Sequence, residues 1–200
     1  MNTGIQLNWK VLPHTWIVLL LAAISFAFSN SIPESWGYEN NVIENAQMVV
    51  LALGFIAALR AREEKQLFIF FALVLVILML REVNCGRTIF FSKPGEVNEF
   101  YKWKEIPYGW VARALYGLYM AWCAWYFISR KLWKGLWNML REVQLPIWHG
   151  VAAAIFIALG MYAEKNLTNL ALEELAEMFF YLILVTGIHI YSSGLKKHHA

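Results

Sequence analysis

Long apolar stretches separated by short polar connections dominate the pattern of this chain. Each stretch is close to the roughly 20 residues that an α-helix needs to cross the hydrocarbon layer of a membrane. Charged residues lie between the stretches and seldom within them, which is typical of helices in lipid and not of the amphipathic helices of a soluble domain. We therefore predict an all-α fold, with residues 1–200 forming one domain that is a bundle of six transmembrane helices. The predicted spans are 12–28, 42–60, 66–84, 108–129, 145–163 and 170–192.

The composition agrees with this pattern. Of the 200 residues, 60% are hydrophobic and 16% aromatic, which is too apolar for a soluble domain of this size. The formal net charge is +3, but the Lys and Arg residues flank the apolar stretches and form no continuous basic groove. We expect membrane lipids as partners and no nucleic acid. The oligomeric state does not follow from the pattern.

The first stretch has a second interpretation. Ser25-Phe26-Ala27 resembles the small-x-small cleavage site of a signal peptide. Lys10 is the only Lys or Arg before the stretch, and the stretch ends in bulky aromatic residues. We therefore favour a retained helix, and cleavage remains the alternative.

Positive residues predict the orientation, because cytoplasmic connections of membrane proteins carry an excess of Lys and Arg. Ten of the seventeen Lys and Arg lie on one side of the predicted membrane, which includes both chain ends. The connection 29–41 on the other side holds none. Both termini are then cytoplasmic. The connection between spans three and four is an exception, because it holds or adjoins Arg81, Arg87, Lys93, Lys102, Lys104 and Arg113.

Two local patterns predict further detail. The segment 130–141 alternates apolar and basic residues with helical spacing, which predicts a short amphipathic helix on the cytoplasmic surface. In the fifth span, small residues recur at every fourth position and predict a face on which helices pack closely. These residues are Gly150, Ala154 and Ala158.

The acidic residues are concentrated on one side of the predicted membrane. All fourteen are glutamates, and eleven of them lie on the side opposite the predicted cytoplasm. Carboxylates at the edge of a hydrocarbon layer are costly to desolvate, so their grouping indicates a site. Glu177 is the clearest case, because it lies about eight residues, or roughly 12 Å, into the last span.

Polar residues near the outer ends of the spans complete this candidate site. Helical spacing places the glutamates of the last span on one face, and the arginines stand near the facing ends of spans three and four. The candidate ligand-binding residues are Glu44, Gln47, Arg81, Glu82, Asn84, Arg87, Arg113, Glu173, Glu174, Glu177 and Tyr181. The alternative is that the same residues are a structural ion-pair network or solvated helix ends.

The sequence excludes several kinds of chemistry. It has no aspartate, no G-x-S-x-G or H-E-x-x-H motif and no phosphate-binding glycine loop. A mixed histidine and carboxylate metal centre is not expected, because the histidines fall at the predicted cytoplasmic end, away from the glutamates. These are His14, His149, His189, His198 and His199. We predict no metal and no cofactor, and the sequence assigns no catalytic residue and does not decide whether the protein is an enzyme.

One set of motifs resembles a known group of proteins. The heptapeptide 81–87 (Arg-Glu-Val-Asn-Cys-Gly-Arg), with Glu44 and the segment 173–178, is similar to a pattern in bacterial inner-membrane proteins of unassigned activity. Members of that group tend to carry two acids at the positions of Arg81 and Glu82, followed by a Ser-Trp-Gly-like triplet. Arg81 and Cys85 depart from the pattern. The resemblance implies a six-helix fold in a bacterial inner membrane with a polar outer site, and it implies no activity.

Our leading hypothesis is a polar pocket that opens to the periplasm and binds a lipid head group or another envelope-related polar ligand. The glutamates would contact its cationic or hydroxyl groups, and Arg81, Arg87 and Arg113 would hold an anionic moiety. The first alternative is a proton- or cation-coupled transporter of a small solute in which Glu177 titrates. The nearly apolar inner halves of spans two and three argue against it. The second alternative is a non-catalytic accessory subunit whose charges hold helices together.

Overall fold

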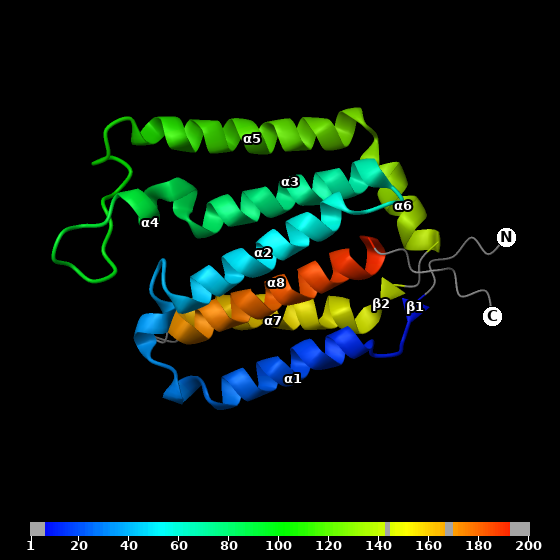
Figure 1. The fold of residues 1–200 in the computed structure, drawn as a ribbon, viewed down its shortest axis with the longest axis horizontal. Coiled ribbons are helices and arrows are strands. Elements are labelled where there is room, and N and C mark those ends of the chain that lie inside the picture. The colour runs from blue at the N-terminus through cyan, green and yellow to red at the C-terminus, as the bar shows by residue number, and fades with distance from the viewer. Residues whose placement is uncertain (1–6, 143–144, 167–169, 193–200) are drawn as a thin grey trace.

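The computed structural model describes residues 7–142, 145–166 and 170–192, and these fold almost entirely into helices (Figure 1). The all-α prediction is confirmed. Within the described part of the chain, six helices of 15 residues or more lie side by side, and their ends fall within three residues of the predicted ranges. They are α1 (Pro13–Ala27), α2 (Val42–Leu59), α3 (Lys65–Glu82), α5 (Gly109–Ser129), α7 (Ile147–Asn166) and α8 (Leu170–Ser192).

Shorter elements connect these helices at the two ends of the bundle (Figure 1). One end, which we name the α4 end, carries η1 (Ser29–Ser31), η2 (Glu34–Gly37), η3 (Asn84–Gly86) and α4 (Arg87–Phe90). The opposite end, named the α6 end, carries the amphipathic helix α6 (Leu132–Glu142). A short parallel pair of strands, β1 (Leu7–Asn8) and β2 (Leu145–Pro146), lies there as well. The first described residue and the end of α8 are therefore at the same end.

Helix α8 is the centre of the bundle. It packs against α2 and α7 and also contacts α1, while α3 packs on α2 and α5 on α3. Its apolar residues face in all directions, so α8 contributes to two hydrophobic cores. Phe179 and Ile183 pack with α1 and α7, whereas Tyr181 and Ile188 pack with α2 and α3. This central position lets residues of α8 meet side chains from several other helices.

The helices indicate a membrane protein. Three segments are long and apolar enough to cross a membrane: Glu34–Leu59, Ile147–Lys165 and Leu170–Ser192. A fourth is added if Lys65–Glu82 and Asn84–Phe90, which meet at a bend of 53°, form one span. Helix α1 is shorter, with 15 residues, and α5 holds an arginine and many Trp and Tyr residues that lower its hydropathy. Six spans with both termini cytoplasmic therefore stay a prediction.

The prediction that the small residues of the fifth span pack against another helix is wrong for the contacts within this chain. Ala154 and Ala158 are exposed, and no heavy atom lies within 4 Å of a Cβ built on Gly150. Helix α7 instead buries Ala152 and Phe156 in the core that it shares with α8. The helix is apolar on every side, so the spacing of small residues does not reveal which side meets a neighbour.

Candidate functional site

Acidic side chains from two helices meet at the α4 end of the bundle. Glu82 is the last residue of α3, and Glu174 and Glu177 lie one turn apart near the start of α8. One carboxylate oxygen from each of the three lies within 4.8 Å of the other two. We name Glu82, Glu174 and Glu177 the carboxylate cluster. Like charges this close repel one another, so the cluster is stabilised by positive charge nearby or by a proton held on one of the carboxylates.

Arg81 and Tyr181 supply part of the compensation. Arg81 Nη2 donates to Glu177 Oε1 at 2.6 Å, and Nη1 donates to the Tyr181 hydroxyl at 2.9 Å. That hydroxyl in turn donates to Glu82 Oε1 at 2.6 Å. Tyr181 is fully buried, while the side chain of Arg81 keeps 52% of its surface exposed. The Arg81 guanidinium therefore contacts the cluster from the solvent-exposed side, and the Tyr181 hydroxyl contacts Glu82 from the buried side.

Helix α2 completes the site with two buried polar residues one turn apart. Gln47 Nε2 donates to Glu174 Oε2 and to the Glu174 carbonyl oxygen, both at 2.9 Å. Glu44 accepts a hydrogen bond from the backbone N–H of Asn40. It lies close enough to Glu82 and Glu174 to interact with both electrostatically. Four glutamates thus share one site with one arginine.

Two oxygens of this site have no partner among the described residues. They are Glu44 Oε1 and Gln47 Oε1, on side chains that are 5% and 0% exposed. Buried polar atoms are nearly always hydrogen-bonded, so an unpartnered pair beside a cluster of carboxylates is unusual. Ionised, the four glutamates carry four negative charges against the single charge of Arg81. Fully ionised, the site would therefore carry an excess of three negative charges.

A break in the backbone follows Glu82 directly. Asn84, Cys85 and Gly86 have φ angles of 44°, 52° and 86°, in the left-handed region that a non-glycine residue enters at a cost of roughly 1–2 kcal/mol. The break turns the chain by 53° between α3 and the helical turns that follow. Asn84 Oδ1 accepts a hydrogen bond from Trp103 Nε1 at 3.3 Å. Backbone strain of this kind concentrates at functional sites, and here it lies beside the carboxylate cluster.

Arg87 belongs to a different group of contacts. Its Nη2 lies 3.9 Å from Glu39 Oε1, and its Nη1 donates to the Tyr101 carbonyl at 3.4 Å. The guanidinium also lies over the ring of Phe100, 5.7 Å from the ring centre. These contacts join the loop before α2 to the loop after α4. Arg87 thus holds the outer loops together beside the cluster.

The predicted site residues separate into two sets. The structure brings seven together: Glu44, Gln47, Arg81, Glu82, Glu174, Glu177 and Tyr181. Arg113 is exposed and makes no ion pair with a described residue, and Glu173 lies at the edge of the cluster. Asn84 and Arg87 contact the outer loop instead. The sequence sorted these residues by depth, but it could not tell which faces of the helices turn inward.

The loop between α4 and α5 forms ion pairs of its own, outside the long helices. Lys93 Nζ lies 2.8 Å from Glu99 Oε2 and 3.8 Å from Glu96 Oε2. A hydrogen bond from Glu96 and the nearby Lys93 ammonium lower the pKa of Glu99 below its usual range. These glutamates are exposed, which makes them suitable controls for the buried ones.

A buried histidine lies away from the carboxylate cluster. The sequence placed His149 at the predicted cytoplasmic end, and the structure shows that it is 6% exposed and lies inside the bundle near the α6 end. One ring nitrogen contacts the Thr15 hydroxyl, and the other lies 3.4 Å from the Thr186 hydroxyl. Two isolated threonines inside apolar spans were the available indication. Among the described residues, the carboxylate cluster is the one group of three metal-ligating side chains close enough to hold an ion.

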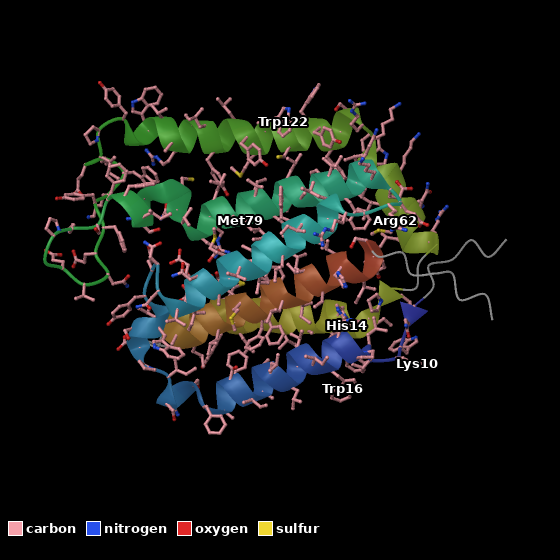
Figure 2. All side chains as sticks on the ribbon, in the orientation of Figure 1. Lys10, His14, Trp16, Arg62, Met79 and Trp122 are labelled. Carbon is pink, nitrogen blue, oxygen red and sulfur yellow. The ribbon has the colours of Figure 1, made fainter. Side chains whose placement is uncertain are left out.

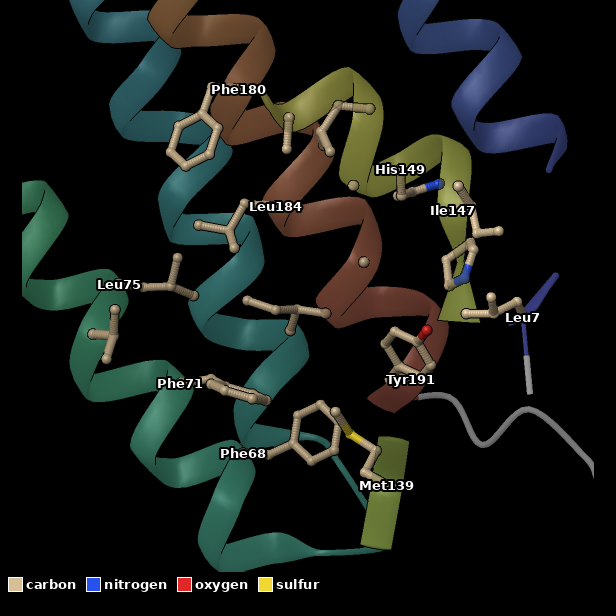
Figure 3. Close-up of a pocket in the computed structure, with 17 residues that line it drawn as sticks. Leu7, Phe68, Phe71, Leu75, Met139, Ile147, His149, Phe180, Leu184 and Tyr191 are labelled. Carbon is tan, nitrogen blue, oxygen red and sulfur yellow. The ribbon is translucent and has the colours of Figure 1, made fainter. Parts of the chain in front are cut away.

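Two cavities lie away from the carboxylate cluster. The first, of about 470 Å³, is almost entirely apolar and lies between α3, α7 and α8 near the α6 end (Figure 3). Phe68, Phe71 and Leu184 line it, with Tyr191 at its edge (Figure 3). The second, of about 730 Å³, lies between α2 and α8. No residue of the carboxylate cluster lines either one.

The chain matches no protein-family model, no curated protein and no solved structure. The arrangement of the side chains is therefore what indicates a function.

Proposed function

We propose that the chain is a multi-pass protein of a bacterial inner membrane whose carboxylate cluster faces the periplasm and binds a cationic group. In this proposal all six long helices cross the membrane and both termini are cytoplasmic. Apolar side chains on the outer helices support it: Trp16 of α1 and Trp122 of α5 are 61% and 45% exposed (Figure 2). Large apolar residues facing outward are expected where lipid covers a helix. The many Lys and Arg residues at the α6 end favour that end for the cytoplasm.

The excess of negative charge at the α4 end carries the functional proposal. The cluster has three carboxylates within 4.8 Å of one another, a buried fourth beside them and one arginine. The sequence predicted no metal, because the histidines and glutamates lie at opposite ends, but carboxylate oxygens alone are the ligands that Mg²⁺, Ca²⁺ and Mn²⁺ prefer. They also form strong charge-assisted hydrogen bonds with the ammonium group of a lipid head group. Both ligands share a positive charge, and an experiment can distinguish them.

The arginines give less support to an anionic moiety in the ligand. Arg81 donates to Glu177 and Tyr181, and Arg87 is occupied by the outer loops. Arg113 is exposed and forms no ion pair with a described residue. The site therefore favours the cationic group of a ligand, and a phosphate on the same ligand has no free pair of arginines there.

A cation-coupled transporter is the second candidate, favoured by the buried His149 near the α6 end. His149 contacts Thr186, which lies nine residues after Glu177 on α8, or roughly 13 Å along the helix. Phe179 and Ile183 fill the stretch between them and are both buried. The described polar residues thus form two separate groups, which supports a binding site more than a pathway.

The test uses the purified protein in detergent micelles. Its thermal unfolding midpoint is measured with MgCl₂, CaCl₂ or MnCl₂ against NaCl of equal ionic strength. In a second arm, phosphatidylethanolamine is compared with phosphatidylcholine. We expect one of these ligands to raise the midpoint of the wild type and to have no effect on Glu174→Gln. The control Glu96→Gln removes an exposed carboxylate and should respond like the wild type.

Two results would count against the proposal. One is a wild type that responds to neither metal nor phosphatidylethanolamine, which favours an accessory subunit with a structural charge network. The other is a folded Glu174→Gln protein that keeps the full response. Proton or cation flux in proteoliposomes that Glu177→Gln abolishes would favour the transporter.

A further inference from the structure

The second cavity has an apolar part and a basic end, and the proposed function explains neither of them. It lies between the second half of α2 and the second half of α8, and its volume is about 730 Å³. From α2 it is lined by Val50, Leu53 and Ile56, and from α8 by Leu182 and Val185. Leu53 and Ile56 are 58% and 42% exposed, so this side of the cavity opens to the outside of the bundle. An apolar groove along the surface of the helices results.

The end of this groove is basic. Arg60 and Arg62, which follow the end of α2, line it together with His189 and Ser192 of α8. Arg62 lies at the α6 end, on the same side of the molecule as Lys10 (Figure 2). Both arginines are exposed, and neither forms an ion pair with a described residue. Their charge is thus available to an anion.

The dimensions fit an amphipathic ligand. Val50 precedes Arg60 by ten residues, which is about 15 Å along a helix. The apolar and basic parts are therefore arranged along the helix axes, with all the positive charge at one end. In a membrane this order matches a phospholipid, whose acyl chains lie along the helices and whose phosphate lies at the interface. Basic pockets between helices at the cytoplasmic side are known to bind anionic head groups.

We propose that this groove is a binding site for an anionic phospholipid, with the phosphate held by Arg60 and Arg62 and an acyl chain along Leu53, Ile56 and Val185. Guanidinium groups donate two parallel hydrogen bonds to phosphate oxygens, which suits them to this role. The site is separate from the carboxylate cluster and lies at the other end of the bundle. It can be tested without any knowledge of the cationic ligand.

The experiment compares phosphatidylglycerol with phosphatidylcholine of the same chain length. The purified protein is exchanged into micelles that contain equal amounts of both, and bound lipid is counted by native mass spectrometry. We expect the wild type to retain phosphatidylglycerol preferentially. Each arginine near the surface strengthens binding of an anionic lipid by about fivefold, so Arg60→Gln/Arg62→Gln should weaken the preference by more than tenfold.

The matched control removes the same charge elsewhere at the same end. Lys131→Gln/Lys134→Gln changes two exposed basic residues beside or within α6 that do not line the groove. This variant should keep the preference for phosphatidylglycerol. An equal loss in both double variants would show a general charge effect and overturn the site.

A second variant tests the apolar part of the groove. Leu53→Trp fills the space beside Ile56 with a larger side chain. Leu53 is on an exposed face, so the helix tolerates the change. The variant should reduce lipid retention while leaving both arginines in place. Inorganic phosphate at the same concentration should not displace the lipid. Displacement by phosphate, or full retention in Leu53→Trp, would mean that the arginines bind a free anion and not a lipid.

Discussion

At the level of single residues, Tyr181 connects the arginine of the site to one of its glutamates. Its hydroxyl accepts from Arg81 and donates to Glu82, and the ring is fully buried. When a buried charged group loses a hydrogen-bond partner, water cannot reach it to replace the lost hydrogen bond. The phenol is therefore a positioning residue for both charges.

The variant Tyr181→Phe tests this role. We expect the free energy of unfolding to fall by about 1–3 kcal/mol, because Glu82 loses a buried donor. The response to the cationic ligand should weaken but persist, since the carboxylates remain. Chemical unfolding in mixed micelles measures the first effect, and the ligand-dependent midpoint measures the second.

Tyr108→Phe is the control, because Tyr108 is 80% exposed. It should change neither quantity. A Tyr181→Phe protein with the stability of the control would mean that the hydroxyl is not needed to hold Arg81 and Glu82.

At the level of elements, the break after α3 is what sets the end of that helix at Glu82. Gly86 has a φ of 86°, and a Cβ built on it meets the Phe90 ring at 3.3 Å. Asn84 and Cys85 before it are also in the left-handed region, so the break depends on three consecutive residues. These three left-handed residues cannot continue the α-helix, so the local conformation of the backbone sets where α3 stops.

We predict that Gly86→Ala destabilises the protein by about 1–2 kcal/mol, because alanine pays for the left-handed conformation that glycine adopts freely. The same variant should weaken cation binding, since Gly86 belongs to the break that follows Glu82, a residue of the carboxylate cluster. The unfolding midpoint with and without the ligand gives both values.

Gly117→Ala provides a matched change inside α5. No atom lies within 4 Å of its added Cβ, and alanine has the higher helix propensity by up to about 1 kcal/mol. This variant should be neutral or more stable. Equal losses in both glycine variants would contradict the role of the left-handed conformation.

At the level of the whole molecule, charge is divided between the two ends. The carboxylate cluster lies at the α4 end, and the basic residues that line the α2–α8 groove lie at the α6 end. A membrane would place these ends in different compartments. The proposed ligands, a cation on one side and an anionic lipid on the other, follow from this division.

Cysteine labelling of intact and permeabilised spheroplasts tests the orientation. In a background with Cys85→Ser and Cys123→Ala, we expect Trp36→Cys to react with an impermeant maleimide from outside. Lys134→Cys should react only after permeabilisation. Both positions are exposed, at opposite ends of the bundle. Labelling of both from the same side would refute the orientation and the periplasmic site together.

The sequence by itself determined the helices and the depth of their polar residues. Apolar length sets where a helix can exist in lipid, and spacing along a helix sets height, so Glu44, Glu82 and Glu177 were expected at one level. The tertiary structure alone decided which residues meet. It grouped Arg81 with Tyr181, left Arg113 outside and buried His149. The physical reason is that a helix that is apolar all round carries no pattern to show which face turns inward, so rotation about its axis is decided by packing.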